Sequence, residues 1–364
     1  MFSLFKKKSP QRMDVFKDVI SQEFHGIHHR DLSSGSLRVI EILQQAGYEA
    51  YLVGGGIRDL LLGKHPKDFD VATSAKPAEI QKLFRKSRII GRRFQIVHVR
   101  MGAEIIEVTT FRGSAENSKL QQANASGMLV RDNVFGTVED DAVRRDFTMN
   151  ALYYNPANHE VLDFVGGYDD LEDGVIRIIG DAETRYREDP VRMLRAVRFI
   201  GKLGLELEEA TAEPIQRLSP LLRDVSPSRL FDEILKLLQA GHGHATFPHL
   251  RIHDLLRPLF PQTHELLEEG DDIHYEELIH LALRNTDTRL NEGKSVTPAF
   301  LYAAMHWPQV HRRWDELEAE GHGRSQALAI ACSETLDFNQ QFIAIPKRFS
   351  ITIREIWELQ AKLE

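Results

Sequence analysis

The sequence predicts an α+β fold, with a mixed β-sheet and helices in the first half and helices alone in the second. Between about Asp31 and Tyr154, short alternating apolar segments typical of strands are interspersed with segments of helical spacing. After about Leu171 the strand signals fade and helical spacing dominates. With 364 residues, 42% of them hydrophobic, the chain can form two or three globular units with their own cores.

The elements of the first half follow from apolar spacing and turn residues. Val39 and Leu43 recur at helical spacing, and Pro77 suits the first turn of a helix. Gly102 and Ala103 separate two alternating segments, which predicts a β-hairpin. In chain order we expect a helix at 37–46, a strand at 50–53, a helix at 57–62, a strand at 68–73, a helix at 77–85 and hairpin strands at 94–101 and 104–111.

A long polar segment at 113–136 is rich in Ser, Asn and Gln. Loops of this length inside a domain are usually functional or disordered. We expect a mobile loop at the mouth of a site, and a passive surface insertion is the alternative.

The second half is expected to be mostly α-helical. We expect helices at 190–203, 213–218, 228–238, 250–255, 274–284, 298–305, 324–335 and 351–363.

Composition limits the class of protein. A single cysteine, Cys332, excludes an internal disulfide framework and favours a cytoplasmic location. No apolar run is long enough to cross a bilayer, so we expect no membrane insertion. The net charge of −8 predicts that any nucleic-acid site is a local basic patch on an acidic protein.

Asp68 and Asp70 follow a glycine turn at 54–56 and are the most informative residues. Side chains two apart on a strand share a face, and adjacent carboxylates repel each other unless a cation lies between them. Mg²⁺ is held by a few carboxylates together with substrate phosphates, while glycines let the backbone approach an anion. A lone Asp-x-Asp is usually a solvated strand end, but this context indicates nucleotidyl transfer from a nucleoside triphosphate.

Two later segments are dense in arginine. Residues 144–151 begin Arg-Arg-Asp and lead into an apolar run, and guanidinium groups bind phosphate oxygens well. In residues 188–198, Asp189 and Arg192 are three apart and are expected to be neighbours on one helix face. A carboxylate beside a guanidinium can read the edge of a base. The alternative for both segments is surface ion pairing.

These motifs, in this order, resemble the class II nucleotidyltransferases, which comprise tRNA CCA-adding enzymes and bacterial poly(A) polymerases. The resemblance runs from about His25 nearly to the end of the chain, and the motifs together are highly specific for the superfamily. Residues 89–99, 185–199 and 235–241 look like the poly(A) polymerase branch.

The resemblance implies a nucleotidyltransferase catalytic head at 31–180 and a helical neck at 181–245 that binds the nucleotide base and RNA. A helical body is implied at 246–364, truncated because the chain stops inside an expected helix, before the basic tail of proteobacterial poly(A) polymerases. Residues 1–30 are expected to form a disordered basic arm.

The resemblance also implies roles for individual residues of the head. Gly55 and Arg58 are expected to contact the triphosphate, and Asp68 and Asp70 to bind Mg²⁺. Arg145 is expected to reach the nucleotide. Asp146 and Glu107 are alternative candidates for a third catalytic carboxylate.

In the neck, Asp189 and Arg192 are expected to read adenine, with Arg195 and Arg198 nearby. The implied activity is template-independent addition of AMP from ATP to RNA 3′ ends with two Mg²⁺ ions, or Mn²⁺ in their place. RNA-chaperone or decay-machinery proteins are the implied partners, and the oligomeric state stays open. CCA addition to tRNA and a non-catalytic RNA-binding protein on the same fold are the alternatives.

Overall fold

The computed structural model describes residues 17–91, 95–113, 122–123, 129–131, 134–270 and 273–363. The chain divides into two compact units. The first comprises residues up to 122 and 130–173, and the second comprises 123–129 and 174–364. The expected head therefore corresponds mainly to the first unit, while the expected neck and body both lie in the second.

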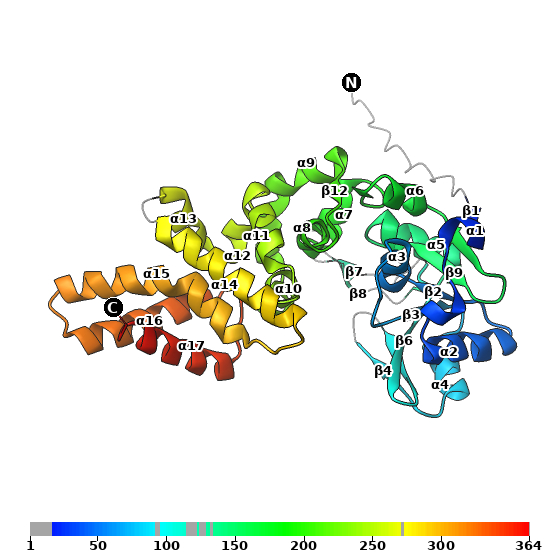
Figure 1. Ribbon diagram of the computed structural model, residues 1–364, viewed down its shortest axis with the longest axis horizontal. Coiled ribbons are helices and arrows are strands. Elements are labelled where there is room, and N and C mark those ends of the chain that lie inside the picture. Colours follow the sequence, from blue (N-terminus) through cyan, green and yellow to red (C-terminus); the bar gives the residue numbers. More distant parts are fainter. Residues whose placement is uncertain are drawn as a thin grey trace, which may run out of the picture. The chain divides into compact units, whose positions relative to one another are not determined.

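The first unit is built on an eight-stranded mixed sheet with the order β1-β10-β9-β2-β3-β6-β5-β4 (Figure 1). Only the pairing of β3 with β6 is parallel among the described strands of this sheet. The strands are β1 (Asp18–Ile20), β2 (Ala50–Val53), β3 (Asp70–Thr73), β4 (Ser87–Ile90), β5 (Ile96–Met101), β6 (Glu104–Thr110), β9 (Leu152–Asn155) and β10 (Glu160–Asp163). The predicted mixed sheet is confirmed.

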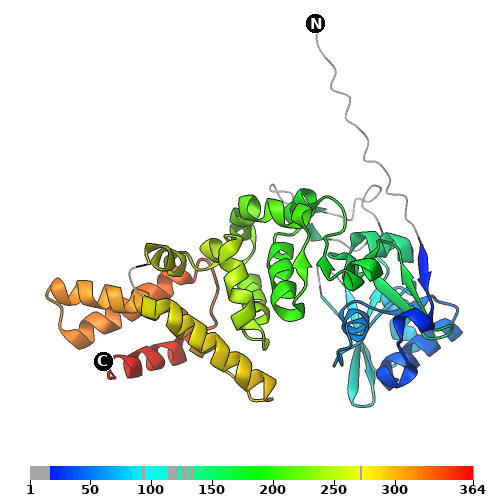
Figure 2. The same cartoon turned by 45° about the horizontal axis from the view of Figure 1, so that its top comes forward.

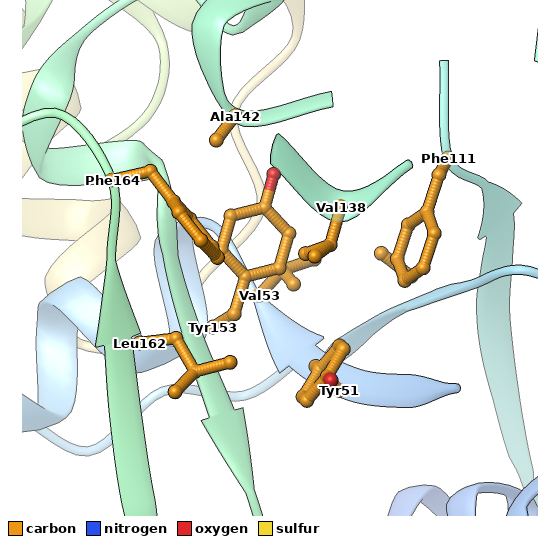
Figure 3. Close-up of a cluster of buried hydrophobic side chains, with 9 residues drawn as sticks. Tyr51, Val53, Phe111, Val138, Ala142, Tyr153, Leu162 and Phe164 are labelled. Atoms are coloured by element: carbon orange, nitrogen blue, oxygen red, sulfur yellow. The ribbon is translucent and has the colours of Figure 1, made fainter. Parts of the chain in front are cut away.

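Helices cover this sheet. They are α1 (Gln22–His25), α2 (Ser34–Gln45), α3 (Gly55–Leu61), α4 (Pro77–Leu83), α5 (Val138–Arg144) and α6 (Gly167–Glu172). Helix α2 contacts β2, β3, β5 and β6, and α4 contacts β4 and β5 (Figure 1). Val138 and Ala142 of α5 join a buried cluster with Tyr51, Val53 and Tyr153 from two neighbouring strands (Figure 3).

The prediction of a disordered arm over residues 1–30 is wrong for residues 17–30. Asp18–Ile20 pairs antiparallel with β10 and Ile20 is buried, and α1 follows directly. Such a short strand shows too little alternation to be recognised in the sequence. Residues 1–16 lie outside the described residues, as does most of the expected mobile loop at 113–136, where only the short pair β7 (Gln122–Ala123) and β8 (Leu129–Arg131) is described.

In the described residues from Gly174 onwards, the second unit is helical, as predicted, apart from turns and a short parallel pair, β11 (Val175–Ile176) with β12 (Glu206–Leu207). Helices α15, α16 and α17 pack together (orange to red in Figure 2). The helices are α7 (Ala182–Glu188), α8 (Val191–Leu203), α9 (Glu209–Leu218), α10 (Pro227–Leu238), α11 (Gly243–Ile252), α12 (Leu256–Leu259), α13 (Pro261–Glu269), α14 (Ile273–Asn291), α15 (Pro298–Ala319), α16 (Arg324–Asn339) and α17 (Lys347–Gln360). Among the described residues, no helix is both long and apolar enough to cross a bilayer.

Candidate active site

The glycine turn after β2 brings an acidic and a basic side chain together. Gly54 has φ 72° and ψ −141°, a conformation that side chains rarely tolerate. A methyl group added at Gly54 would lie 3.6 Å from Arg145 Nη1 and 3.8 Å from Asp70 Oδ2. One added at Gly56 would lie 3.1 Å from the carbonyl oxygen of Asp68. The turn is therefore in close contact with the segment that carries both aspartates.

The two aspartates alternate with a buried phenylalanine. Asp68 is exposed, Phe69 is buried and Asp70 is partly buried, which fits the predicted common face of the carboxylates. The structure starts the strand only at Asp70, so Asp68 precedes it.

The parallel register of β3 and β6 adds a third carboxylate. Val71 pairs with Val108, so Asp70 lies level with Glu107 on the next strand. Burial raises the pKa of Asp70 to about 6; the charges of Glu107 and Asp68 add to this effect, while Arg145 opposes it. Glu107 is therefore close enough to Asp70 to act with it. His98, its cross-strand neighbour on β5, places Nε2 3.3 Å from Glu107 Oε1.

Arg145, at the end of α5, is held by two residues that the sequence analysis did not select. Its Nε and Nη2 donate to Asp141 Oδ2 at 3.1 and 3.0 Å, and Nε also donates to the Tyr153 hydroxyl at 2.9 Å. Burial disfavours the charged guanidinium, but these two partners raise its pKa above the ordinary value, so the side chain stays protonated. The i, i+4 spacing of Asp141 and Arg145 was the available sequence signal.

Asp146 has local partners. Its Oδ1 accepts hydrogen bonds from the Phe147 N–H at 2.8 Å and from Asn150 Nδ2 at 3.0 Å. Asn150 belongs to the 3₁₀ turn at Thr148–Asn150. The Asp146 side chain thus helps to fix this turn through Oδ1.

Arg58, which is expected to contact the triphosphate, is buried. Its side chain is 4% exposed, and it donates to Asn150 Oδ1 at 2.7 Å and to Asp59 Oδ1 at 2.6 and 2.8 Å. These bonds tie α3 to the 3₁₀ turn. Gly55, by contrast, begins α3 directly after the Gly54 turn.

The acidic residues fit a metal ion whose remaining ligands come from the substrate. Within the described part of the chain, no group of three or more His, Cys, Asp or Glu side chains is arranged to hold a metal ion. Asp68 and Asp70 can supply a few oxygen ligands, and Mg²⁺ takes its remaining ligands from water and substrate phosphates. Burial raises the pKa of Asp70, the charges of Glu107 and Asp68 add to this effect, and a bound cation would offset it.

Asp189 and Arg192 each form an ion pair with another residue of the second unit. Asp189 Oδ2 accepts from Arg229 Nη2 of α10 at 2.8 Å, and Arg192 Nη1 donates to Glu188 Oε2 at 3.0 Å. Asp189 lies before α8, so it does not share the helix face as expected. Arg229 was missed because it is 40 residues away in sequence.

The predicted basic stripe on α8 is present. Arg192, Arg195 and Arg198 recur every third residue, and each is partly exposed. The guanidinium carbons of Arg195 and Arg198 lie 5.7 and 5.2 Å from the centre of the Phe199 ring. Cation–π contact of this kind orients both guanidinium groups.

Comparison with protein families and known proteins identifies the family. Residues 50–177 match the poly A polymerase head domain, 204–267 match the probable RNA and SrmB-binding site of polymerase A, and 320–364 match the polymerase A arginine-rich C-terminus. Poly(A) polymerase I of Salmonella typhimurium is 51% identical over 350 residues, which cover 95% of this chain and 75% of that protein. The chain belongs to the poly(A) polymerase family. Poly(A) polymerase I of Haemophilus influenzae is 48% identical, with 98% and 80% covered.

CCA-adding enzymes are the more distant relatives of this poly(A) polymerase family member. The CCA-adding enzyme of Lactobacillus helveticus is 38% identical over 217 residues, which cover 60% of this chain and 53% of that enzyme. Among solved structures, the Bacillus stearothermophilus CCA-adding enzyme in complex with CTP has a TM-score of 0.58 and 27% identity, with 90% of this chain and 81% of that chain covered. The α+β nucleotidyltransferase fold is thereby confirmed.

Proposed function

We propose that this chain is a poly(A) polymerase that transfers AMP from ATP to the 3′ ends of RNA without a template. The observation that carries the proposal is the convergence of Asp70 and Arg145 on the Gly54 turn, with Glu107 level with Asp70 on the next strand. Negative groups for a divalent cation and a positive group for a phosphate lie together there. The high coverage of the poly(A) polymerase I relatives favours this activity over CCA addition.

In the proposed reaction, Asp68 and Asp70 hold Mg²⁺, with Glu107 as the third carboxylate. Two bound divalent ions, Mg²⁺ or Mn²⁺, would lower the pKa of the RNA 3′-hydroxyl and neutralise charge on the leaving pyrophosphate. Arg145 keeps its positive charge and presents Nη1 towards the turn, where it binds the nucleotide. Positioning and charge neutralisation dominate phosphoryl-type transfer, so the head needs no strong general base.

We assign the selection of the nucleotide base to residues of the second unit. Asp189 and Arg192 select adenine, each oriented by its ion-pair partner, and Arg195 and Arg198 extend the basic stripe towards phosphates. With a net charge of −8, RNA binding relies on such local patches. The single cysteine favours the reducing cytoplasm as the place of the reaction.

The test is extension of a labelled RNA primer with each of the four nucleotides in separate reactions with Mg²⁺. We expect tails with ATP alone, and none when EDTA replaces Mg²⁺. Incorporation of CTP, followed by a single AMP on tRNA, would instead identify a CCA-adding enzyme. RNA binding without incorporation of any nucleotide would identify a non-catalytic protein on this fold.

A further inference from the structure

The guanidinium of Arg145 is anchored along one edge by two buried side chains. Asp141 Oδ2 receives hydrogen bonds from Arg145 Nε and Nη2, and the Tyr153 hydroxyl receives one from Nε. The third nitrogen, Nη1, donates to the Asn150 carbonyl oxygen at 3.4 Å and is the nearest Arg145 atom to the Gly54 turn. Since the guanidinium is planar, fixing one edge fixes the direction of Nη1.

Asp141 and Tyr153 bind each other as well as Arg145. The Tyr153 hydroxyl donates to Asp141 Oδ2 at 2.7 Å, so each of the three residues is hydrogen-bonded to the other two. The other carboxylate oxygen, Oδ1, accepts from the Arg112 N–H at 3.0 Å. Burial raises the pKa of Tyr153 far above its ordinary value, so its hydroxyl keeps the proton that it donates.

The anchor is rigid because its tyrosine is embedded in the core. Tyr153 is fully buried, and its ring meets Phe164 and Tyr51 edge to face with centroids 5.9 and 6.1 Å apart. Figure 3 shows its hydroxyl oxygen at the end of this cluster, beside the segment that carries Ala142. Close-packed side chains of this kind have little freedom to reorient.

We infer that Asp141 and Tyr153 are positioning residues that aim Nη1 of Arg145 at the bound nucleotide. The inference rests on the proposed function, since it gives Arg145 a nucleotide to bind. Neither residue touches the substrate. The buried network already restricts the Arg145 side chain, so less conformational entropy is lost when the guanidinium binds a ligand.

The test compares two adjacent buried tyrosines. Tyr153→Phe removes only the hydroxyl of the network, while the control Tyr154→Phe removes a hydroxyl whose partner is His159 Nδ1 at 3.1 Å. Both rings are fully buried. For Tyr153→Phe we expect the Kd for ATP, measured by calorimetry, and the KM for ATP to rise about tenfold, because a hydrogen bond to a charged group is lost. We expect kcat to change by less than about threefold.

For Tyr154→Phe we expect unchanged ATP binding and kinetics and a similar small fall in thermal stability. If both variants lose stability alike and neither changes ATP affinity, Tyr153 is structural and the inference is wrong. Asp141→Asn keeps the shape of the side chain and should also weaken ATP binding.

A double-mutant cycle separates this inference from the proposed function. In an Arg145→Ala background, Tyr153→Phe should cause no further loss of ATP affinity, because its effect passes through Arg145. An equal loss in both backgrounds would contradict the positioning role. If the wild type fails to incorporate ATP at all, the proposed function fails; if it incorporates ATP but Tyr153→Phe binds ATP normally, only this inference fails.

Discussion

Two polar networks, one in each unit of the chain, differ in their charge and in their burial. In the first unit, Asp70 lies among the charges of Glu107, Asp68 and Arg145. In the second, His306 Nδ1 lies 3.0 Å from Gln309 Oε1, and Gln309 Nε2 donates to Thr263 Oγ1 at 2.7 Å. The first network concentrates charge, whereas the second is neutral.

The neutral network closes on the backbone. The hydroxyls of Thr263 and Tyr275 both donate to the Met305 carbonyl oxygen, at 3.0 and 2.6 Å. Burial lowers the pKa of His306 to about 4, which keeps the ring neutral. A neutral network with internal partners stabilises a fold. Crowded carboxylates with a raised pKa are typical of a site that is completed by a ligand.

The largest expected effect is the loss of catalysis in Asp70→Asn. Removing a metal-binding carboxylate should lower ATP incorporation about a thousandfold or more, since metal ions contribute several kcal/mol of charge stabilisation. The matched change in the other network, His306→Leu, should leave kcat/KM within about twofold at temperatures where the protein is folded. Primer extension measures both. Equal losses of activity would remove the distinction between the networks.

The second prediction decides between the two candidates for the third carboxylate. Glu107→Gln should lower kcat about a hundredfold, as expected for loss of one charged group at the reaction centre. Asp146→Asn should cost less than about tenfold in kcat and appear mainly as lower thermal stability, since Asp146 fixes the 3₁₀ turn. Single-turnover ATP incorporation measures the chemical step. The reverse order of effects would assign the role to Asp146.

The third prediction concerns the stability of the metal-free protein at different pH values. Because the pKa of Asp70 rises from 3.8 to about 6 on folding, the folded state holds its proton through this range. Stability should therefore fall as pH rises from about 4 to about 6. At pH 7.5, Asp70→Asn should raise the free energy of unfolding by about 1–3 kcal/mol. Urea unfolding in EDTA, with hydrogen exchange followed in each unit, measures the free energy of unfolding. If Asp70→Asn is no more stable than the wild type at pH 7.5, the raised pKa of Asp70 is contradicted.

His306 should show the opposite dependence on pH. Its pKa falls from 6.5 to about 4 on folding, so the unfolded chain binds the proton first. The stability of the second unit should therefore fall as pH is lowered from about 6.5 to about 4. His306→Leu should remove this slope and, by leaving Gln309 Oε1 without its donor, cost about 1–3 kcal/mol at neutral pH. Hydrogen exchange within α15 is the measurement, and an unchanged slope would contradict the assignment.

The smallest expected effect lies at the base-selecting residues. Arg229→Gln removes the partner of Asp189 and should raise the KM for ATP, or relax the preference for ATP over other nucleotides, about three- to tenfold. The control is Arg217→Gln, which removes an exposed ion pair with Glu183 and should change neither quantity. Kinetics with ATP and GTP measure the effect. Similar behaviour of the two variants would show that Asp189 does not need its partner.

The sequence was most informative where a motif and local periodicity agreed. The strand at 50–53 and the paired Asp68 and Asp70 followed from alternation and glycine turns, and the mixed sheet and helical second half were confirmed. What it missed depends on contacts between distant residues. Tyr153 and Arg229 acquire partners only through folding, and the register of β3 and β6 selects Glu107.

Local sequence patterns also could not predict which charged side chains are buried. Arg58 belongs to a motif expected to contact phosphates, yet its guanidinium is enclosed by Asp59 and Asn150. Helical spacing also does not describe how Asp189 lies relative to Arg192, because Asp189 precedes α8.

The most direct test of the metal site is a crystal structure with Mn²⁺ and a non-hydrolysable ATP analogue, in which anomalous scattering locates the ions. We predict Mn²⁺ bound by the carboxylates of Asp68 and Asp70 and by the phosphates of the analogue, with Arg145 Nη1 within hydrogen-bonding distance of the nucleotide. Anomalous peaks only at other positions, or a nucleotide bound away from the Gly54 turn, would contradict the account.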